Sequence, residues 1–273
     1  MINLNIFNIL KYKLVRIIES NPTLNLLIYN NVRFFKFLLP HEKDYLGMKK
    51  ICKNDVNATI IDVGANLGIS TMGFREMGFK NNIYIYEPNY EIYKKYLKPL
   101  VKTYKKLHIN NFALGDKNHT KNFYIPYYKG KPIHYFGSFN RSYIVNSIKI
   151  TFPKLLLDIE IKKRKVRIQK FDSLKSKFKP HFIKIDVEGY DHIVIKGLIK
   201  TIKKHKPIIL VEYNKENFLI IKNYLKKYGA YIYNIEENRF LKLKKKYFKK
   251  TISRSNKTNL LSNRNIYFLP NAE

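Results

Sequence analysis

The sequence is poor in several residue types, and their absence limits what the protein can be. It contains no tryptophan, 11 glycines and a single cysteine, Cys52, among 273 residues. One cysteine can form neither an intrachain disulfide nor an all-cysteine zinc site. A secreted scaffold built on disulfides is therefore excluded, and we expect a reducing, cytoplasmic location.

Long apolar runs are also absent. A membrane-spanning helix needs about 20 consecutive apolar residues, and no stretch of the sequence approaches that length. Residues 7–18 carry apolar side chains at helical spacing with basic residues between them, which predicts an amphipathic helix rather than a signal peptide. We expect residues 1–48 to form a helical extension that packs on the domain, with a surface anchor as the alternative.

Acidic residues are scarce, with 20 Asp and Glu against 53 Lys and Arg, and the formal net charge is +33. Such a charge produces a field that attracts nucleic acid, anionic lipid or acidic glycan. The composition is also rich in Lys, Asn, Ile and Tyr, which an A+T-rich coding sequence yields without selection for charge. Residues 241–257 carry eight Lys or Arg and no acid, so a polyanion contact and a solvated loop are both open there.

The most informative stretch is Thr59–Thr71, an apolar β-branched run that breaks at an acid and two glycines before a helical segment. This order predicts a buried strand, a tight turn and a helix. Gly64 and Gly68 would let a ligand approach the backbone, and Asp62 could accept a hydrogen bond from a ligand amine. Asn66 stands where a dinucleotide fingerprint has its middle glycine, which favours a smaller nucleoside ligand. A plain strand–helix corner with packing glycines is the alternative.

A second predicted strand, Asn82–Pro88, follows this unit. It ends in Glu87, near the distance at which an acid on the second strand reaches ribose hydroxyls. Strand, glycine turn, helix, strand and terminal acid together predict a nucleoside-binding unit.

The rest of the chain continues to alternate strands and helices, which predicts a doubly wound, mostly parallel α/β sheet. Further strands are expected over residues 106–116, 181–187, 207–214 and 231–235, with 265–270 returning as an antiparallel last strand. We assign residues 49–273 to one domain. Residues 117–170 interrupt the alternation, so we expect an insertion of short strands and loops there, where substrate choice would lie.

With these segments in place, the chain resembles the FkbM family of methyltransferases, a branch of the Rossmann-like enzymes that use S-adenosylmethionine. The resemblance covers roughly residues 40–235. It rests on segments in a fixed order: Asp62–Gly68, Tyr86–Pro88, Asn111–Asp116, Phe171–Leu174, Ile183–Asp191 with Lys196–Gly197, and Ile209–Tyr213. His192, where an acidic or apolar residue is expected, departs from the pattern.

The resemblance implies a Rossmann-like class I methyltransferase fold with S-adenosylmethionine as cofactor. Four residues of the glycine turn would line the methionine end of the cofactor: Gly64, Ala65, Asn66 and Gly68. Glu87 would hold the ribose, and Asn111 with Ala113 would flank the adenine. Family members are typically O-methyltransferases, which implies that the acceptor is a hydroxyl of a sugar, a glycan or a related small molecule.

Transfer to an alcohol requires a group that accepts the hydroxyl proton. Asp186, at the carboxyl end of a central strand, is our first candidate for this base and Glu188 the second. Asp186 as a helix cap is the alternative. Asp186 and Glu212 should end neighbouring strands, and Mg²⁺ takes oxygen ligands of this kind, but two acids are too few to assign a metal.

Two other classes of function compete with this interpretation. The charge allows an RNA methyltransferase, although the sequence has no RNA-binding module signature and no catalytic cysteine pattern. A non-catalytic adaptor that kept the fold is the other class, and it predicts damage to a cofactor turn that is in fact intact. The acceptor, the position methylated and the oligomeric state are not determined by the sequence.

Overall fold

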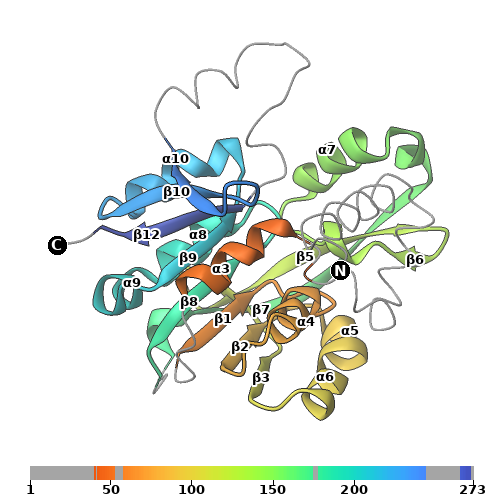
Figure 1. Ribbon diagram of the computed structural model, residues 1–273. Helices are drawn as coiled ribbons and strands as arrows, with labels where there is room; N and C mark the ends of the chain where they lie inside the picture. Colours follow the sequence, from red (N-terminus) through yellow and green to blue (C-terminus); the bar gives the residue numbers. More distant parts are fainter. Residues whose placement is uncertain (1–39, 41, 53–57, 175–177, 244–264, 272–273) are drawn as a thin grey trace, which may run out of the picture.

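The computed structural model describes residues 40, 42–52, 58–174, 178–243 and 265–271 (Figure 1). The amphipathic helix expected in residues 1–48 and most of the basic segment 241–257 lie outside these residues. Within them, the chain forms an eight-stranded sheet and a separate four-stranded sheet.

The large sheet has the strand order β11-β10-β12-β9-β8-β1-β2-β3. Its strands are β1 Thr59–Val63, β2 Asn82–Tyr86, β3 Leu107–Asn110, β8 Pro180–Ile185, β9 Ile208–Glu212, β10 Tyr228–Asn234, β11 Arg239–Lys242 and β12 Asn265–Pro270. Strands β3, β2, β1, β8 and β9 pair in parallel. Strand β12 inserts antiparallel between β9 and β10. The predicted mostly parallel sheet with an antiparallel last strand is therefore confirmed, and β11 is an additional edge strand.

The central strands are buried on both faces, because helices cover each side of the sheet. All five residues of β1 are buried, and alternate side chains enter different cores: Ile60 packs on one face, Ile61 and Val63 on the other. Burying each such side chain contributes about 1.5–3 kcal/mol. A strand buried on both faces reads as a continuous apolar run, which is the pattern of a parallel sheet.

Two groups of helices form these layers (Figure 1). One face carries α3 Leu46–Ile51, α4 Ile69–Glu76, α5 Tyr90–Ile92 and α6 Lys98–Thr103, the last two joined by a π-helical segment, Tyr93–Leu97. The other face carries α8 Asp191–Gly197, α9 Ile199–His205 and α10 Lys215–Tyr224. Asn89 caps α5 by accepting the N–H of Glu91. Helix α10 begins at Lys215, where the side chain of Asn214 caps it by accepting the N–H groups of Glu216 and Asn217.

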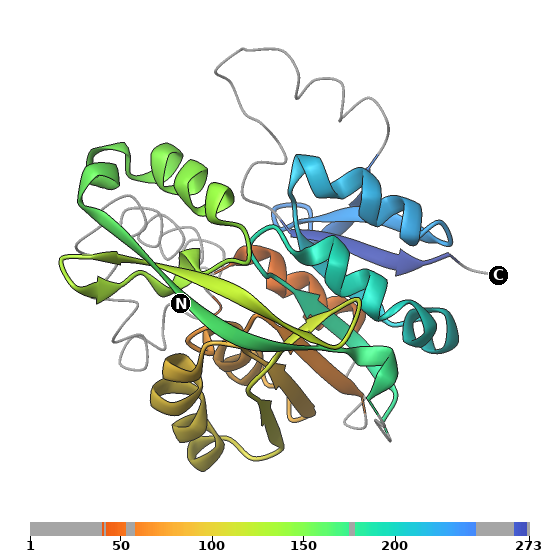
Figure 2. The ribbon, with the colours of Figure 1, turned by 180° about the vertical axis from the view of Figure 1, so that it is seen from behind.

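The chain between β3 and β8 builds the second sheet, in the order β4-β7-β5-β6. Its strands are β4 Ala113–Gly115, β5 His119–Tyr128, β6 Lys131–Pro132 and β7 Ile159–Lys170. The antiparallel β5–β7 pair crosses the large sheet (Figure 2). Helix α7, Arg141–Thr151, lies between β6 and β7 along the chain. The expectation of short strands and loops is wrong here, since β5 and β7 have 10 and 12 residues.

The segment predicted as one strand over 106–116 is in fact split between the two sheets. Strand β3 ends at Asn110, and β4 begins at Ala113 and pairs with β7. Between them, Asn111 Nδ2 donates to the carbonyls of Glu87 and Pro88, at 3.0 and 3.2 Å. These bonds turn the chain away from the edge of the large sheet.

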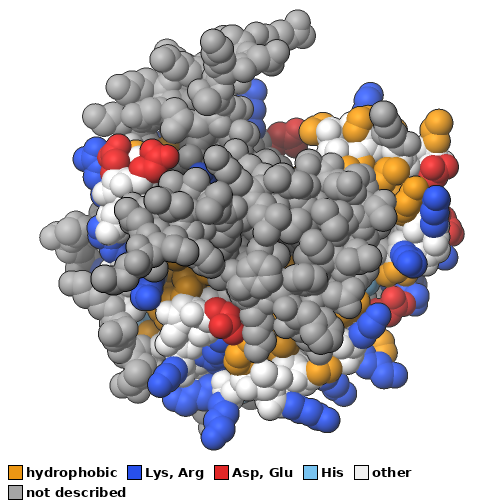
Figure 3. Space-filling model, turned by 45° about the vertical axis from the view of Figure 1, so that its right-hand side comes forward, with side chains coloured by type: hydrophobic (Ala, Val, Ile, Leu, Met, Phe, Trp, Pro, Cys, Tyr) orange, Lys and Arg blue, Asp and Glu red, His pale blue; other side chains and the backbone are white. Residues whose placement is uncertain are grey.

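Short 3₁₀ turns complete the described chain at Lys43–Tyr45, His134–Phe136, Pro153–Asp158 and Phe171–Ser173. Figure 3 shows one face of the molecule, on which Lys and Arg side chains are spread along the edge and acidic side chains are few. No helix in the described part of the chain has the length and apolar character needed to cross a membrane.

Candidate active site

A cavity of about 230 Å³ lies at the carboxyl ends of the parallel strands. The turn after β1, the chain after β2, the loop after β8 and the end of β9 form one wall, and the insertion forms another. Open α/β sheets bind ligands at this edge, where loops diverge from a rigid sheet. Every candidate site residue from the sequence lies at or next to this cavity, but their roles differ.

Every second residue of the glycine turn has a left-handed backbone conformation, with φ of 76° at Gly64, 50° at Asn66 and 82° at Gly68. Gly64 N–H donates to the Tyr86 carbonyl at 2.9 Å. A Cβ on Gly64 would lie 1.9 Å from the carbonyl oxygen of Asp186. Gly64 also lines the cavity. It therefore lets two protein backbones approach each other, and its predicted contact with a ligand stays a prediction.

Gly68 is not among the residues that line the cavity, and its predicted contact with the cofactor stays a prediction. It is the N-cap residue of α4, and a Cβ there would lie 2.4 Å from the Leu100 side chain. Its role in this structure is to allow α4 to pack against α6. Ala65 and Asn66 do line the cavity.

Asp62 lies beneath the cavity rather than in it. Its side chain is fully buried, and Oδ2 accepts hydrogen bonds from Ser70 Oγ at 2.5 Å and Thr71 Oγ1 at 2.8 Å. Oδ1 lies 3.4 Å from Lys184 Nζ. The predicted direct bond from Asp62 to a ligand amine is therefore not what the structure presents, because the carboxylate instead joins β1 to the first turn of α4.

Glu87 lines the cavity and organises it. Its Oε2 accepts the N–H of Asn66 at 3.0 Å and Oε1 accepts the N–H of Asn89 at 2.8 Å, so the carboxylate ties the glycine turn to the end of β2. Burial raises its pKa to about 7, partly offset by these two bonds. The sequence analysis selected Glu87 as the residue that holds the ribose, which stays a prediction. Its bonds to the glycine turn are seen only in the structure.

Of the two residues predicted to flank the adenine, one lines the cavity and the other does not. Ala113 lines the cavity. Asn111 does not, because its amide is bonded to the carbonyls of Glu87 and Pro88. Asn111 thus supports the segment that presents Glu87, and a direct contact with a base is not shown.

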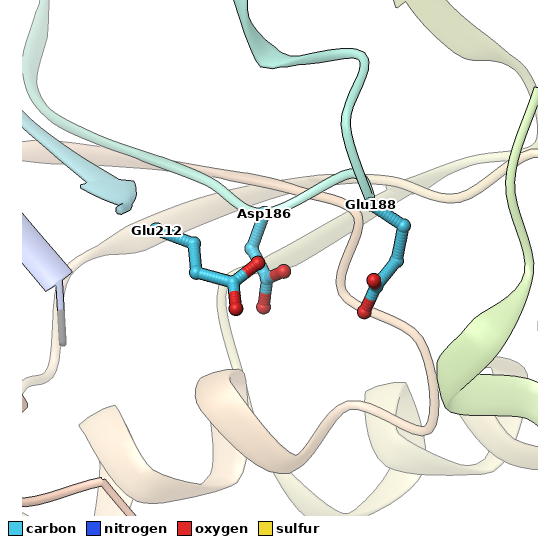
Figure 4. Close-up of side chains that lie close together, drawn as sticks. All are labelled: Asp186, Glu188 and Glu212. Carbon is cyan, nitrogen blue, oxygen red and sulfur yellow. The ribbon is translucent and has the colours of Figure 1, made fainter. Parts of the chain in front are cut away.

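Three carboxylates meet at the centre of the cavity. Asp186, Glu188 and Glu212 each place an oxygen within 4.8 Å of the others. In Figure 4 the groups of Asp186 and Glu212 lie side by side, and Glu188 approaches from the loop after β8. Burial, together with the neighbouring acids, raises the pKa of Glu188 and of Glu212 well above the usual range. Like charges this close disfavour full ionisation, so the cluster shares protons.

The loop after β8 is held by the insertion. Glu188 has φ of 50°, Ser138 Oγ donates to its carbonyl at 2.8 Å, and its carboxyl bonds to the hydroxyl of Tyr143 on α7. Helix α8 begins at Asp191, whose Oδ1 accepts the N–H of Val187 at 3.3 Å. Because Tyr190 is the N-cap residue of α8, the alternative in which Asp186 caps this helix is wrong.

Lys184 is the main residue that the sequence analysis did not select. It is 3% exposed, and its Nζ lies 3.1 Å from Asp186 Oδ2 and 3.4 Å from Asp62 Oδ1. Burial lowers the pKa of this lysine, but Asp186 and Asp62 outweigh burial and the net shift is upward. A lysine inside the apolar run 182–185 was the available signal.

Carboxylates at this spacing could hold a hard cation such as Mg²⁺. Against this, the Lys184 ammonium, whose Nζ lies 3.1 Å from Asp186 Oδ2, would repel the ion. We therefore assign no metal to the cluster.

Aromatic side chains and one histidine come from the insertion. Phe123, His134, Tyr135 and Phe139 line the wall opposite the glycine turn. Burial, with a smaller effect of Lys95, lowers the pKa of His134 to about 4, so its ring is neutral at pH 7. Among the described residues, His134 Nδ1 and Asn66 Oδ1 are buried polar atoms that lack a hydrogen-bond partner. No sequence pattern pointed to His134.

Solved structures offer similar chains at low identity. The FkbM methyltransferase of Methylobacillus flagellatus KT has 14% identity and a TM-score of 0.47, covering 96% of this chain and 58% of that one. The precorrin-6y C5,15-methyltransferase of Geobacter metallireducens GS-15 has 11% identity and a TM-score of 0.38, covering 82% and 84%. The plantazolicin methyltransferase BpumL, in complex with SAH and a monoazolic desmethylPZN analog, has 10% identity and a TM-score of 0.38, covering 96% of both.

The present chain thus spans 58% of the length of the Methylobacillus protein. All three TM-scores are below 0.5, so these structures carry no argument about function. No curated protein matches the chain. The family model of the methyltransferase FkbM domain matches residues 62–232, which is more than half of the sequence. The chain therefore belongs to the FkbM methyltransferase family.

Proposed function

We propose that the protein transfers a methyl group from S-adenosylmethionine to a hydroxyl oxygen of a sugar, a glycan or a related small acceptor. The observation that carries this proposal is the position of Asp186. Its carboxylate lines the cavity at the end of the central strand β8, in contact with the Lys184 ammonium. A carboxylate in this place can accept the proton of an alcohol.

The residues around the cavity fit S-adenosylmethionine. Asn66 Oδ1 and His134 Nδ1 are buried without hydrogen-bond partners among the described residues, so both can bond to a ligand. The Glu87 carboxylate faces the same space and, with oxygens already fixed by two N–H groups, is held ready for ribose hydroxyls. Acidic side chains at the cavity favour the positive sulfonium. The residues we assign to cofactor binding are those of the predicted set that line the cavity: Gly64, Ala65, Asn66, Glu87 and Ala113. Asp62, Gly68 and Asn111 support them.

S-adenosylmethionine, when bound, supplies a methyl carbon that accepts the hydroxyl oxygen as the carbon–sulfur bond breaks and its electron pair stays on sulfur. The protein must align the acceptor and remove one proton. We assign proton removal to Asp186, whose side chain is 28% exposed toward the cavity. The proton moves from the acceptor hydroxyl to this carboxylate.

Glu188 is the second candidate for the base. Burial and the neighbouring acids raise the pKa of this residue and of Glu212, which favours their protonated forms. A protonated carboxyl can donate a hydrogen bond, which suits both residues to hold hydroxyl groups of a polar acceptor. The division of roles that we propose is therefore one base, Asp186, and two anchors, Glu188 and Glu212.

The insertion supplies the rest of the acceptor site. Phe123, Tyr135 and Phe139 offer apolar surface, which can pack on an acceptor and keep water from the reacting atoms. We also place the protein in the cytoplasm, on the basis of its single cysteine.

RNA is a weaker acceptor on physical grounds. The cavity is lined by five acids, Glu42, Glu87, Asp186, Glu188 and Glu212, and by one lysine, Lys184. Phosphates entering this space would meet carboxyl groups rather than the surface lysines that attract them.

The test combines binding with product analysis. Calorimetry should show that S-adenosylmethionine and its demethylated product bind and that NAD⁺ does not; tight binding of NAD⁺ would refute the cofactor assignment. Incubation of sugars, glycans and RNA with methyl-labelled cofactor, followed by mass spectrometry, should place the label on a sugar hydroxyl. Label on RNA alone would refute the acceptor class.

The base is tested by Asp186→Asn. We expect turnover to fall about 100-fold or more, while cofactor affinity and unfolding temperature stay close to those of the parent protein. Asp158→Asn is the matched control, because Asp158 is exposed at the end of a 3₁₀ turn away from the cavity. Full turnover in Asp186→Asn would exclude this residue as the base.

A further inference from the structure

Lys184 occupies an unusual position for a charged residue. It lies near the carboxyl end of β8, between Ile183 and Ile185, and is 3% exposed. In the parallel register it stands opposite Asp62 of β1. Side chains two apart on one strand share a face, so Lys184 and Asp186 extend on the same side of the sheet.

The lysine ammonium collects three oxygen neighbours at the carboxyl end of the sheet. They are Asp186 Oδ2 at 3.1 Å, Asp62 Oδ1 at 3.4 Å and the Gly64 carbonyl at 3.4 Å. One of these carboxylates is buried beneath the cavity and the other lines it. The ammonium therefore connects the interior of the sheet to the reaction space.

Stability alone does not account for this arrangement. The desolvation of two buried charges offsets most of their attraction, so a buried ion pair contributes little net stability compared with an apolar pair of similar size. The contact to Asp186 adds a feature that an apolar pair would lack. It places a fixed positive charge beside the Asp186 carboxylate of the acidic cluster.

This contact distinguishes Asp186 from its neighbours. Among the described residues, the ion pairs of Lys184 are with Asp62 and Asp186, and neither Glu188 nor Glu212 takes part. A nearby opposite charge favours the ionised form of a carboxyl. The contact uses Oδ2 of Asp186, which leaves Oδ1 for the acceptor hydroxyl.

We infer that Lys184 is a positioning residue for methyl transfer: its ammonium holds Oδ2 of Asp186 and fixes the carboxylate so that the other oxygen faces the acceptor. This inference rests on the proposed role of Asp186 as the base.

The test needs a variant that removes the ammonium without leaving Asp62 as an uncompensated buried charge. Lys184→Met combined with Asp62→Asn does this, since asparagine keeps an oxygen that can accept from Ser70 and Thr71. Asp62→Asn alone is the reference. Compared with it, we expect the double variant to fold and to bind S-adenosylmethionine with an affinity within about threefold, while kcat falls at least 10-fold; Lys184→Arg should recover part of kcat.

A double-mutant cycle then separates positioning from an independent effect. In the Asp186→Asn background, the Lys184→Met and Asp62→Asn changes should lower kcat no further. Recovery of full kcat in the Lys184→Met and Asp62→Asn variant would overturn the inference and reduce the lysine to a structural partner of Asp62. An equal loss of kcat in both backgrounds, or a loss of cofactor affinity in place of kcat, would also overturn it. Full activity of Asp186→Asn alone would instead refute the proposed base.

Discussion

Gly64→Ala tests whether the glycine turn exists to bring two backbones together. The φ of Gly64 is 76°, and an added Cβ would lie 1.9 Å from the carbonyl oxygen of Asp186. The left-handed conformation costs an L-residue about 1–2 kcal/mol. The atomic overlap adds a separate cost, because backbone rather than a flexible side chain must move.

The movement would strain hydrogen bonds on both sides of the contact. Gly64 N–H bonds to the Tyr86 carbonyl at 2.9 Å, and Asp186 N–H to the Val63 carbonyl at 3.1 Å. Each such bond contributes about 0.5–1.5 kcal/mol. We expect Gly64→Ala to lower the free energy of unfolding by about 3–5 kcal/mol and to abolish cofactor binding, because the turn and the Asp186 loop separate.

Gly130→Ala is the matched control. Gly130 has φ of 73°, but nothing lies within 4 Å of the position a Cβ would take, so only the conformational cost of about 1–2 kcal/mol applies. Denaturant unfolding should separate the two variants by about 2 kcal/mol or more, and thermal unfolding by at least roughly 4 °C. Equal destabilisation of the two variants would refute the close-approach explanation.

Two other predictions concern the acid of the second strand and the basic segment. Glu87→Gln should weaken S-adenosylmethionine binding by about 1–3 kcal/mol in calorimetry, since a charged acceptor is lost; unchanged affinity would remove Glu87 from the cofactor site. Because burial raises the pKa of Glu87 to about 7, the folded state holds its proton more tightly than the unfolded state. Its contribution to stability is therefore fully present below about pH 4.5 and is lost, by up to about 3 kcal/mol, as pH rises from there through about 7; Glu87→Gln should flatten that slope in denaturant unfolding, and an unchanged slope would show that the proton is bound elsewhere. For the basic segment, binding to an anionic glycan or RNA should fall steeply with added salt and should weaken when five lysines are changed to Gln: Lys244, Lys245, Lys246, Lys249 and Lys250. A variant that binds equally well would favour the solvated loop.

Most strands of the large sheet could be predicted because each one is marked by the local sequence. Each parallel strand is a short apolar run followed by a polar turn, and β1, β2, β8 and β9 were all found in this way. The second sheet could not be found so easily. Strand β7, Ile159–Lys170, has half of its residues exposed and is rich in Lys and Arg. It is a strand because it pairs with β5 from Ile159 to Ile168, and pairing between distant segments leaves no local pattern.

The site shows the same division between local and distant information. The positions of Asp186 and Glu87 at strand ends follow from the sequence, because parallel strands bring their carboxyl ends to one edge. The roles of Gly64, Gly68 and Asn111 depend on what lies opposite them: a carbonyl of another loop, a leucine of α6 and two carbonyls near β2. Tertiary packing fixes those neighbours, and the sequence does not show them. The sequence analysis could therefore predict only that these residues contact the ligand.

The net charge of the whole chain does not describe the residues that line the cavity. The chain carries +33, yet the cavity is lined by five acids and one lysine. Surface lysines set the long-range field and thus the encounter with polyanions, whereas the ligand that stays in the cavity is selected by the groups that touch it. Burial and the neighbouring acids raise the pKa of Glu188 and Glu212, and the Lys184 ammonium lies against Asp186. The acids can therefore share one small space, because a tendency to hold protons and a neighbouring ammonium both reduce the repulsion between them.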